Sequence, residues 1–574
     1  MVAPAGISIR EAALLKGISL DSPCAGTGKC GKCRVKLDSE KTLRLACGTF
    51  PEKDTVVHIP GTATGHSGTK KASMLPDCLI KTGLKPSVFR KTVRLPLPSI
   101  KNPVSDSENL KRALGGRHSS INFNLECLRE LPQAIRKSGY RVTATVDRNE
   151  LIAVEPAGTS VKNYGLAFDL GTTSVCGALV DLSTGRVLAT ASQANAQLIY
   201  GDDVISRITH SINHLRGLKE LGEKAVFTIN SVIAKLIKEA GIAKKNIYSM
   251  ALVGNPTMIH LLLGIPPDAI AFSPYIPALN CSVTVKAGEL GLEMHPCSNL
   301  YVFPGLGGYV GGDTVALILA ARLNKPGKTS LAIDLGTNGE VALSRGGKIV
   351  AASTAAGPAF EGGHIKHGMR AVSGAIETVI LKNGEVFLRA IDDRPPAGLC
   401  GSGLVDAAAE LLREKIISET GYLKPAAELK TLFSRRIIEG KSGRAFKLTA
   451  GKQPITITQK DIREFQLAKG AIRACIRILL KEAGVRQGEL DEILIAGTFG
   501  NNLRKESLAG VKMIPALPAE KITFIGNAAM AGAVLGLLNE GLRKEAELLA
   551  KTAVYVELSD RKDFQEEFAG SLSF

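Results

Sequence analysis

Two short stretches of the chain follow one plan: Phe168-Asp169-Leu170-Gly171-Thr172-Thr173 and Ile333-Asp334-Leu335-Gly336-Thr337-Asn338. In each, an apolar run that is typical of a buried strand ends at an Asp, and a Gly-Thr turn follows. The Gly lets backbone N–H groups approach phosphate oxygens, while the Asp can hold Mg²⁺ through water or orient an attacking water molecule. One copy alone would also fit an ordinary strand-to-turn joint. Two copies predict a duplicated lobe with a nucleotide bound between the halves.

The two stretches supply the candidate residues of this site. We expect Asp169 and Asp334 to be the catalytic carboxylates. The expected phosphate-binding residues are Gly171, Thr172, Thr173, Gly336, Thr337 and Asn338.

The rest of each half supports the duplication. Each half begins with a predicted three-stranded meander, over residues 164–191 and 330–352, and helices and strands then alternate. Later buried strands end at Val253-Gly254-Asn255 and at Ala496-Gly497-Thr498-Phe499-Gly500-Asn501. This part of the chain resembles the actin, sugar kinase and heat-shock chaperone ATPase superfamily, whose lobes have a ribonuclease H-like fold. The resemblance implies that ATP and Mg²⁺ bind here, with the nucleoside against Gly497, Thr498, Phe499 and Gly500.

Four cysteines gather near the N-terminus, at Cys24, Cys30, Cys33 and Cys47, while the other seven are scattered singly. Four thiolates can hold either a zinc ion or an iron-sulfur cluster. Zinc sites usually pair two C-x₂-C units, whereas these ligands are split three and one. The Gly-rich loop also offers backbone N–H groups to bridging sulfides, which a zinc ion does not need. The pattern favours a [2Fe–2S] cluster over zinc.

The residues around this cluster loop resemble a plant- or adrenodoxin-type ferredoxin. Residues 7–22 match the strand, helix and turn before the loop, and residues 55–60 match the closing strand. The chain begins where that family already has its first hairpin, so a first strand is expected to be missing or the start to be late. The interval from Cys33 to Cys47 is also shorter than in plant ferredoxins. We therefore expect a truncated β-grasp with an exposed edge.

The chain divides into five predicted parts. Residues 1–60 are the ferredoxin-like domain, and residues 61–74 are a Gly-, Thr- and Ser-rich linker. Residues 75–160 alternate between strand and helix patterns without a catalytic constellation, which predicts a small α+β middle domain. The two ATPase lobes follow at 161–328 and 329–574. The predicted fold class is α/β multidomain, with duplicated actin-like lobes as its largest part.

Composition limits the function classes. The 574 residues are 45% apolar with no Trp, and no apolar run approaches the ~20 residues of a membrane span. With no signal-peptide pattern either, we expect a cytoplasmic protein without a membrane partner. The formal charge of +18 could indicate nucleic acid, but Lys and Arg are spread without an aromatic-interleaved stripe. The pattern predicts no nucleic-acid partner and leaves an acidic protein partner open.

The order of these parts resembles one family, the ATP-dependent reductive activators of corrinoid proteins. Its motifs here include Ala356-Gly-Pro-Ala-Phe-Glu-Gly-Gly363, Ala397-Gly-Leu-Cys-Gly-Ser-Gly-Leu-Val-Asp-Ala407, Phe524-Ile-Gly-Asn-Ala-Ala-Met-Ala-Gly-Ala533 and, in the first half, Asn195-Ala-Gln197 with 200–208. The resemblance implies that an electron on the iron-sulfur cluster is passed to a Co(II) corrinoid, restoring Co(I). It implies two partners, a corrinoid protein of a methyltransferase system and an upstream low-potential electron donor, and it leaves a homodimer open.

Other interpretations remain at this point. The chain could be a kinase of a small metabolite with a redox sensor attached, or a nucleotide-switched scaffold whose cluster is structural. His364 and His367 could be metal ligands, although no third ligand has a useful spacing. Cys400 lies in a Gly-rich turn before a predicted helix, which would lower its pKa, but it has no nucleophile motif.

Overall fold

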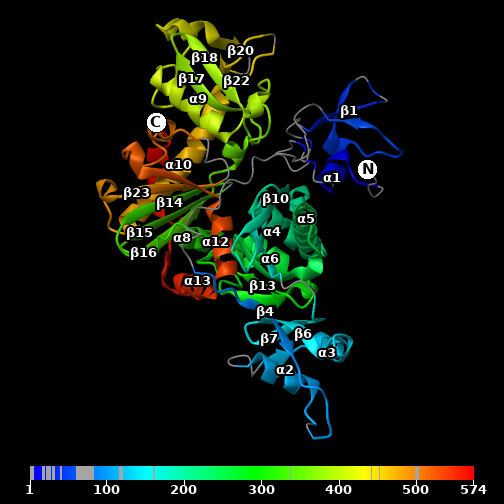
Figure 1. The fold of residues 1–574 in the computed structure, drawn as a ribbon. Helices are drawn as coiled ribbons and strands as arrows, with labels where there is room; N and C mark the ends of the chain where they lie inside the picture. The colour runs from blue at the N-terminus through cyan, green and yellow to red at the C-terminus, as the bar shows by residue number, and fades with distance from the viewer. Residues whose placement is uncertain are drawn as a thin grey trace.

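The computed structural model describes residues 6–15, 18, 20, 28, 33–38, 40, 42–59, 83–101, 103–115, 121–158, 162–336, 338–440, 443–451, 453–497 and 503–574. The predicted linker, residues 61–74, lies outside these ranges. Figure 1 shows two lobes side by side, with the middle domain below one of them and the N-terminal domain near its other end. None of the helices in the described ranges is both long and apolar enough to cross a bilayer.

Lobe I is built on a six-stranded sheet with the strand order β10-β9-β8-β11-β13-β12. The strands are β8 (Tyr164–Leu170), β9 (Ser174–Asp181), β10 (Val187–Ala194), β11 (Ile247–Gly254), β12 (Val283–Lys286) and β13 (Asn299–Val302). β8, β9 and β10 form the predicted antiparallel meander, and β11 pairs parallel with β8 and β13. Every residue of β11 is buried, because a parallel strand at the centre of a sheet has both faces covered. The covering helices include α4 (Val204–Asn213), α5 (Gly217–Ala240), α6 (Pro256–Leu263) and α7 (Asp268–Ala271).

Lobe II repeats five strands of this topology in the strand order β24-β23-β14-β15-β16-β25, and its sixth strand, β25, lies beside β16 at the opposite edge from that of β12 in lobe I. Its strands are β14 (Thr329–Leu335), β15 (Gly339–Arg345), β16 (Lys348–Thr354), β23 (Glu492–Ala496), β24 (Ile522–Gly526) and β25 (Val554–Tyr555). The two Asp residues lie at equivalent strand positions, with Asp169 of β8 opposite Cys176 of β9 and Asp334 of β14 opposite Glu340 of β15, but the turn that follows is one residue shorter in lobe II. The predicted duplication of the meander and of the following parallel strands is confirmed.

Two apolar helices join the lobes, α8 (Gly312–Ala320) of lobe I and α12 (Ala528–Leu538) of lobe II. They pack against each other within a core cluster that both lobes share. A Cβ built on Gly532 would lie 2.2 Å from the backbone oxygen of Ala316, so only glycine permits this separation. Figure 1 shows α8 and α12 next to each other between the two lobes.

Gly532→Ala is expected to lower the free energy of unfolding by about 2–3 kcal/mol, because the added methyl group meets backbone that cannot move aside. Denaturant unfolding measures this difference. Gly570→Ala is the matched control, since a Cβ on Gly570, within the helix α14 (Lys562–Ser571), meets nothing within 4 Å. Equal losses in the two variants would contradict the close packing of α8 on α12.

Lobe II also carries a subdomain between β16 and β23 that the sequence patterns did not predict (Figure 1). It contains two three-stranded sheets, β18-β17-β19 and β20-β21-β22. The elements are β17 (Ala375–Lys382), β18 (Glu385–Ala390), β19 (Gly398–Leu399), α9 (Gly401–Arg413), β20 (Ile437–Gly440), β21 (Gly443–Lys447) and β22 (Thr456–Thr458). The long helix α10 (Gln459–Glu482) then begins at a capping box of Thr458 and Asp461 and returns the chain to the lobe II sheet. Three further helices follow, α11 (Lys505–Gly510), α13 (Glu540–Thr552) and α14.

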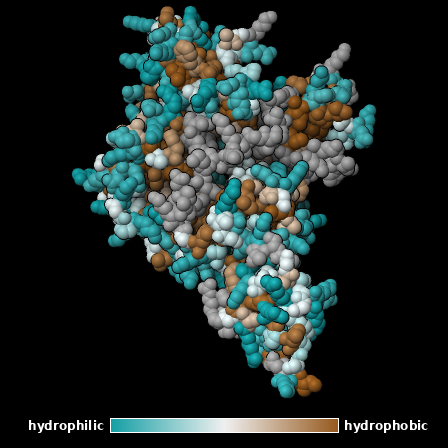
Figure 2. Space-filling view, in the orientation of Figure 1, coloured by the Kyte–Doolittle hydropathy of each residue, from teal (hydrophilic) through white to brown (hydrophobic). Residues whose placement is uncertain are grey.

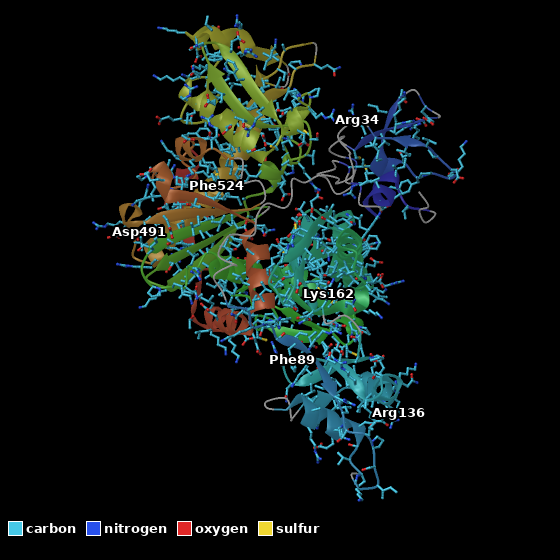
Figure 3. The ribbon with its side chains drawn as sticks, in the orientation of Figure 1. Arg34, Phe89, Arg136, Lys162, Asp491 and Phe524 are labelled. Carbon is cyan, nitrogen blue, oxygen red and sulfur yellow. The ribbon has the colours of Figure 1, made fainter. Side chains whose placement is uncertain are left out.

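The middle domain is a four-stranded sheet, β4-β6-β7-β5, with two helices. Its elements are β4 (Val88–Arg94), α2 (Asp106–Leu114), β5 (Asn122–Phe123), α3 (Leu125–Lys137), β6 (Arg141–Asp147) and β7 (Glu150–Pro156). Arg90 joins it to lobe I, because its guanidinium contacts Glu155 and the Tyr248 hydroxyl and donates to the Lys162 backbone oxygen at 3.2 Å. Figure 3 labels Phe89, the neighbour of Arg90 on β4, at the boundary between this domain and lobe I. The predicted α+β character is confirmed.

The N-terminal domain has a small sheet in the order β2-β1-β3 with one helix packed on it. Its elements are α1 (Ile9–Leu15), β1 (Arg34–Leu37), β2 (Leu43–Leu45), the 3-10 helix η1 (Ala46–Gly48) and β3 (Val57–His58). Several large apolar side chains stay exposed on it, namely Leu43, Phe50 and Val56. In Figure 2, apolar residues gather on this domain, whereas polar residues cover most of the visible lobe surfaces.

Candidate nucleotide and cluster sites

A cleft of about 800 Å³ opens between the two lobes, and both predicted Asp residues line it. The other predicted residues along its wall are Gly171, Thr172, Thr173, Gly336, Asn338 and Gly497. Thr337, Thr498, Phe499 and Gly500 lie outside the described residues. The structure thus brings the described members of both predicted stretches into one site.

The first turn of the cleft is held tightly. The Gly171 N–H donates to the Ser174 oxygen at 3.1 Å, and the Gly336 N–H donates to the Asn338 oxygen at the same distance in lobe II. A Cβ on Gly171 would lie 2.7 Å from the Ser174 oxygen, so this turn requires glycine. Residues 171–173 are called the phosphate loop below.

Buried polar side chains form hydrogen bonds with the phosphate loop. Asn195 Nδ2 donates to the Gly171 oxygen at 3.0 Å, and Arg207 Nη2 donates to the Thr172 oxygen at 2.5 Å. Asn255 Nδ2 reaches the Thr172 hydroxyl at 3.0 Å. Burial lowers the pKa of Arg207 to about 10, which leaves the guanidinium charged at neutral pH. The family motifs at 195–197 and 200–208 therefore include residues that hold the loop.

Five carboxyl groups line the cleft, and the charges of four of them influence one another. Asp169 and Asp334 were predicted, whereas Asp313 and Glu340 were not. Desolvation within the deep cleft and, as the next cause, the charge of a neighbouring Asp raise the pKa of Asp169 and of Asp334 to about 7. Burial also raises the pKa of Asp313 to about 6 and that of Glu340 well above its ordinary value. This mutual repulsion favours the binding of a cation.

The donor chemistry of this cleft fits Mg²⁺, which prefers oxygen ligands and keeps several of its waters. Within the described ranges, no three His, Cys, Asp or Glu side chains are placed to bind a metal directly. The carboxylates that line the cleft would hold Mg²⁺ together with nucleotide phosphates.

The raised pKa values predict a pH-dependent response to nucleotide. The pKa values of Asp169 and Asp334 rise from an ordinary 3.8 to about 7 in the folded protein. The folded state therefore binds a proton at each carboxyl group more tightly than the unfolded state does. Their contribution to the stability of the nucleotide-free protein therefore falls as the pH rises from 3.8 to about 7.

A cation that binds in the cleft must displace these protons at low pH. The increase in melting temperature on adding Mg²⁺ and a non-hydrolysable ATP analogue should be larger at pH 8 than at pH 6; equal increases would contradict this.

Two hydrogen bonds cross the cleft between the lobes. The Thr173 hydroxyl donates to Glu361 Oε2 at 3.1 Å, and Asn527 Nδ2 donates to Asp169 Oδ2 at 3.2 Å. Sequence reasoning did not assign roles to Glu361 or Asn527. Each nevertheless belongs to a Gly-rich motif of lobe II, and that motif was the available signal.

The turn after β23 has the close backbone contact expected of a nucleoside-binding turn. Gly497 has φ +107°, and a Cβ there would lie 2.6 Å from the Leu335 oxygen. In lobe I, a Cβ built on Gly254 would likewise lie 2.8 Å from the Leu170 oxygen. Only glycine lets these strand ends approach so closely, which supports the predicted pairing of the two turns.

Two side chains that follow residues 498–502 bind the inserted subdomain. The Ser507 hydroxyl donates to Asp406 Oδ1 at 2.6 Å, and Arg504 Nη1 donates to Glu410 Oε1 at 3.1 Å. Asp406 and Glu410 lie on α9 of the inserted subdomain. This subdomain thus fixes one end of the predicted nucleoside turn, a contact that sequence spacing could not reveal.

Two of the four predicted cluster ligands are described, and they are neighbours. Cys33 and Cys47 are both buried in the core of the N-terminal domain. The Ala46 N–H donates to the Cys33 backbone oxygen at 2.7 Å, and Arg34 pairs with Leu45 across β1 and β2. Cys24 and Cys30 lie outside the described residues. The backbone segments that carry Cys33 and Cys47 are therefore paired with each other in this domain.

The expected lowering of the Cys400 pKa is wrong. Cys400 does precede α9, but it is buried, and desolvation raises the pKa of its thiol despite the hydroxyl of Ser402 nearby. A thiol in this environment is a poor nucleophile. His364 approaches Glu464 at 3.6 Å and belongs to no metal-binding group among the described residues.

Comparisons with known proteins cover almost the whole chain. The RACo linker region matches residues 80–161, the RACo middle region matches 164–326, and the C-terminal ASKHA domain of RACo matches 328–574. The corrinoid activation enzyme RamQ of Eubacterium limosum is 33% identical over 571 residues, covering 97% of this chain and 94% of that protein. The [Co(II) methylated amine-specific corrinoid protein] reductase of Methanosarcina barkeri is 26% identical over 429 residues, covering 72% and 77%.

A solved structure agrees with these relatives. The structure of a reductive activator for corrinoid, iron-sulfur protein aligns with a TM-score of 0.79 and 33% identity, covering all of this chain and 96% of that chain. The mixed α/β architecture and the actin-like lobes are therefore those of a known group. The chain belongs to the RACo family.

Proposed function

We propose that this protein is an ATP-dependent reductive activator, which passes one electron to the inactive Co(II) corrinoid of a partner protein and restores Co(I). The observation that carries this proposal is the cleft between the lobes, where Asp169 and Asp334 converge, in a chain whose family membership extends over nearly its whole length. An ATPase module joined to a redox module has the two parts that such a reaction needs.

The redox module is the N-terminal domain. We propose that a [2Fe–2S] cluster binds there to Cys24, Cys30, Cys33 and Cys47. When bound, the cluster would supply a single electron at low potential, ~−400 mV for the plant type. The burial of Cys33 and Cys47 supports this assignment, because it excludes water from that side of the site.

The ATPase module would supply the driving force. Gly171, Thr172, Thr173, Gly336, Thr337 and Asn338 are the proposed phosphate ligands, and Gly497, Thr498, Phe499 and Gly500 are the proposed nucleoside contacts. Asp169 and Asp334 would hold water around Mg²⁺ and orient the attacking water molecule. Because both lobes contribute to one cleft, hydrolysis would change how the lobes close. That change would bias an electron transfer that is otherwise uphill.

The proposed partners follow from this reaction. One is a corrinoid protein of a methyltransferase system, and the other is a low-potential electron donor upstream. We place the reaction in the cytoplasm, with residues 1–60, 61–74, 75–160, 161–328 and 329–574 as the functional parts.

The test is an anaerobic spectroscopic assay with a Co(II) corrinoid protein, a low-potential reductant and the full-length activator. Co(I) should accumulate only when ATP and Mg²⁺ are both present, and ADP should form in parallel. Co(I) formation at the same rate without ATP would overturn the proposal. Transfer of the γ-phosphate to a small metabolite would favour a kinase instead.

A further inference from the structure

A buried arginine of the N-terminal domain contacts lobe I. Arg10 lies on α1, and its Nη2 donates to the backbone oxygen of Leu198 at 3.1 Å. The arginine is only 3% exposed. A reciprocal pair of Ser8 and Glu11 caps the start of α1, with Glu11 N–H donating to the Ser8 hydroxyl at 3.2 Å and Ser8 N–H to Glu11 Oε2 at 2.7 Å. The short helix is thereby fixed where Arg10 meets lobe I.

Leu198 belongs to a 3-10 helix, η4 (Ala196–Ile199), that is bonded to the phosphate loop. The Asn195 N–H donates to the Thr173 oxygen at 2.9 Å, and its side chain holds the Gly171 oxygen. Gln197 Oε1 accepts from Arg207 Nη1 at 3.0 Å, and the same guanidinium binds the Thr172 oxygen. All three carbonyl groups of the phosphate loop are therefore bonded either to Asn195, which caps η4, or to Arg207, which also donates to Gln197 of η4.

The other end of the contact leads to a proposed cluster ligand. The backbone N–H of Ile9, next to Arg10, donates to the Thr49 oxygen at 2.9 Å. α1 also packs on η1, which contains Cys47. A continuous set of bonds and packed elements thus joins the phosphate loop to the cluster domain.

We propose that Arg10 is a positioning residue that couples nucleotide binding at the phosphate loop to the docking of the cluster domain on lobe I. The inference rests on the proposed function, because it gives the ATPase cleft a route to the electron carrier. Movement of the phosphate loop displaces η4 and so changes the acceptor that Arg10 reaches. By linkage, docking and nucleotide affinity must influence each other to the same extent.

Hydrogen exchange on the full-length, cluster-loaded protein tests this coupling. Arg10→Met removes the donor, and Arg44→Met is the control, because Arg44 pairs with Glu40 at the exposed surface of the same domain. Loss of a buried charge-assisted hydrogen bond should make the α1 amides exchange about tenfold faster in Arg10→Met. Arg10→Lys keeps a donor and should restore part of the protection. The visible spectrum of the cluster shows whether each variant is folded.

The decisive measurement adds Mg²⁺ and a non-hydrolysable ATP analogue. In the wild type, exchange of α1 should change together with exchange of residues 195–200, whereas in Arg10→Met only residues 195–200 should respond. The analogue's Kd should differ between Arg10→Met and Arg44→Met. Unchanged α1 exchange in the wild type, despite a response at 195–200, would overturn the inference and leave the proposed function standing. A wild type that hydrolyses no ATP would instead contradict the proposed function.

Discussion

Asp169→Asn and Asp334→Asn are each expected to lower ATP turnover by about 10²-fold or more, the order expected when a positioned acid-base or metal-orienting group is lost. The amide keeps the shape of the carboxylate but cannot carry its negative charge, so the attraction for Mg²⁺ and the orientation of water are weakened. Both residues line the same cleft, and each influences the charge of its neighbours. ATP-dependent formation of Co(I) should be lost in parallel with ADP release.

The control for these variants is Asp181→Asn. Asp181 ends β9 in lobe I, the lobe that contains Asp169. It accepts a hydrogen bond from the Ser183 N–H at 2.9 Å in a surface turn. Its turnover should match that of the wild type. The cluster spectrum should be unchanged in all three variants, because the cluster belongs to another domain. Retention of wild-type turnover in Asp169→Asn and Asp334→Asn would exclude both residues from the chemistry.

Cys33→Ala and Cys47→Ala are expected to abolish the visible absorption of a [2Fe–2S] cluster and, with it, Co(I) formation. In the proposed cluster four thiolates would complete the ligand shell, so removal of either buried thiol would leave one iron without a ligand. ATP hydrolysis should stay within about twofold of the wild type, since the cleft residues remain in place. Iron and sulfide analysis of anaerobically purified protein should find about two of each in the wild type.

Cys281→Ala is the matched cysteine control, because Cys281 is exposed and lies in lobe I. It should keep the full iron content and spectrum. Stoichiometric zinc without a visible band in the wild type would contradict the electron-transfer function. The same result would favour a structural metal in a nucleotide-switched scaffold.

Much of the two-lobed fold could be predicted because its signals are local. The apolar run of β11 and the Gly-rich turns after β8 and β14 carry their structural meaning within a few neighbouring residues. The repetition of these turns then identified the duplication. Because each Asp belongs to one copy of the repeat, Asp169 and Asp334 could be predicted to share a site although they are 165 residues apart in the sequence.

The remaining cleft residues depend on contacts between distant segments. Glu340 faces Asp334 only because β14 and β15 pair in one particular register. Asn527 reaches Asp169 only after the two lobes have packed. The inserted subdomain has no counterpart among the described residues of lobe I, so the repeated pattern could not predict it. The pKa of Cys400 depends on burial, which a sequence pattern at the start of a helix does not indicate. Such properties arise from tertiary packing, so a single sequence contains only indirect signals of them.

The glycine contact between α8 and α12 limits how the lobes can move. At Gly532 no side-chain layer separates the helices, so sliding one along the other would drive the Ala316 carbonyl group into the neighbouring backbone. Rotation about the crossing point keeps that contact while it opens or closes the cleft at a distance from the axis. Rotation about the crossing of α8 and α12 would therefore turn a small angular change near Gly532 into a larger displacement at the ends of the lobes.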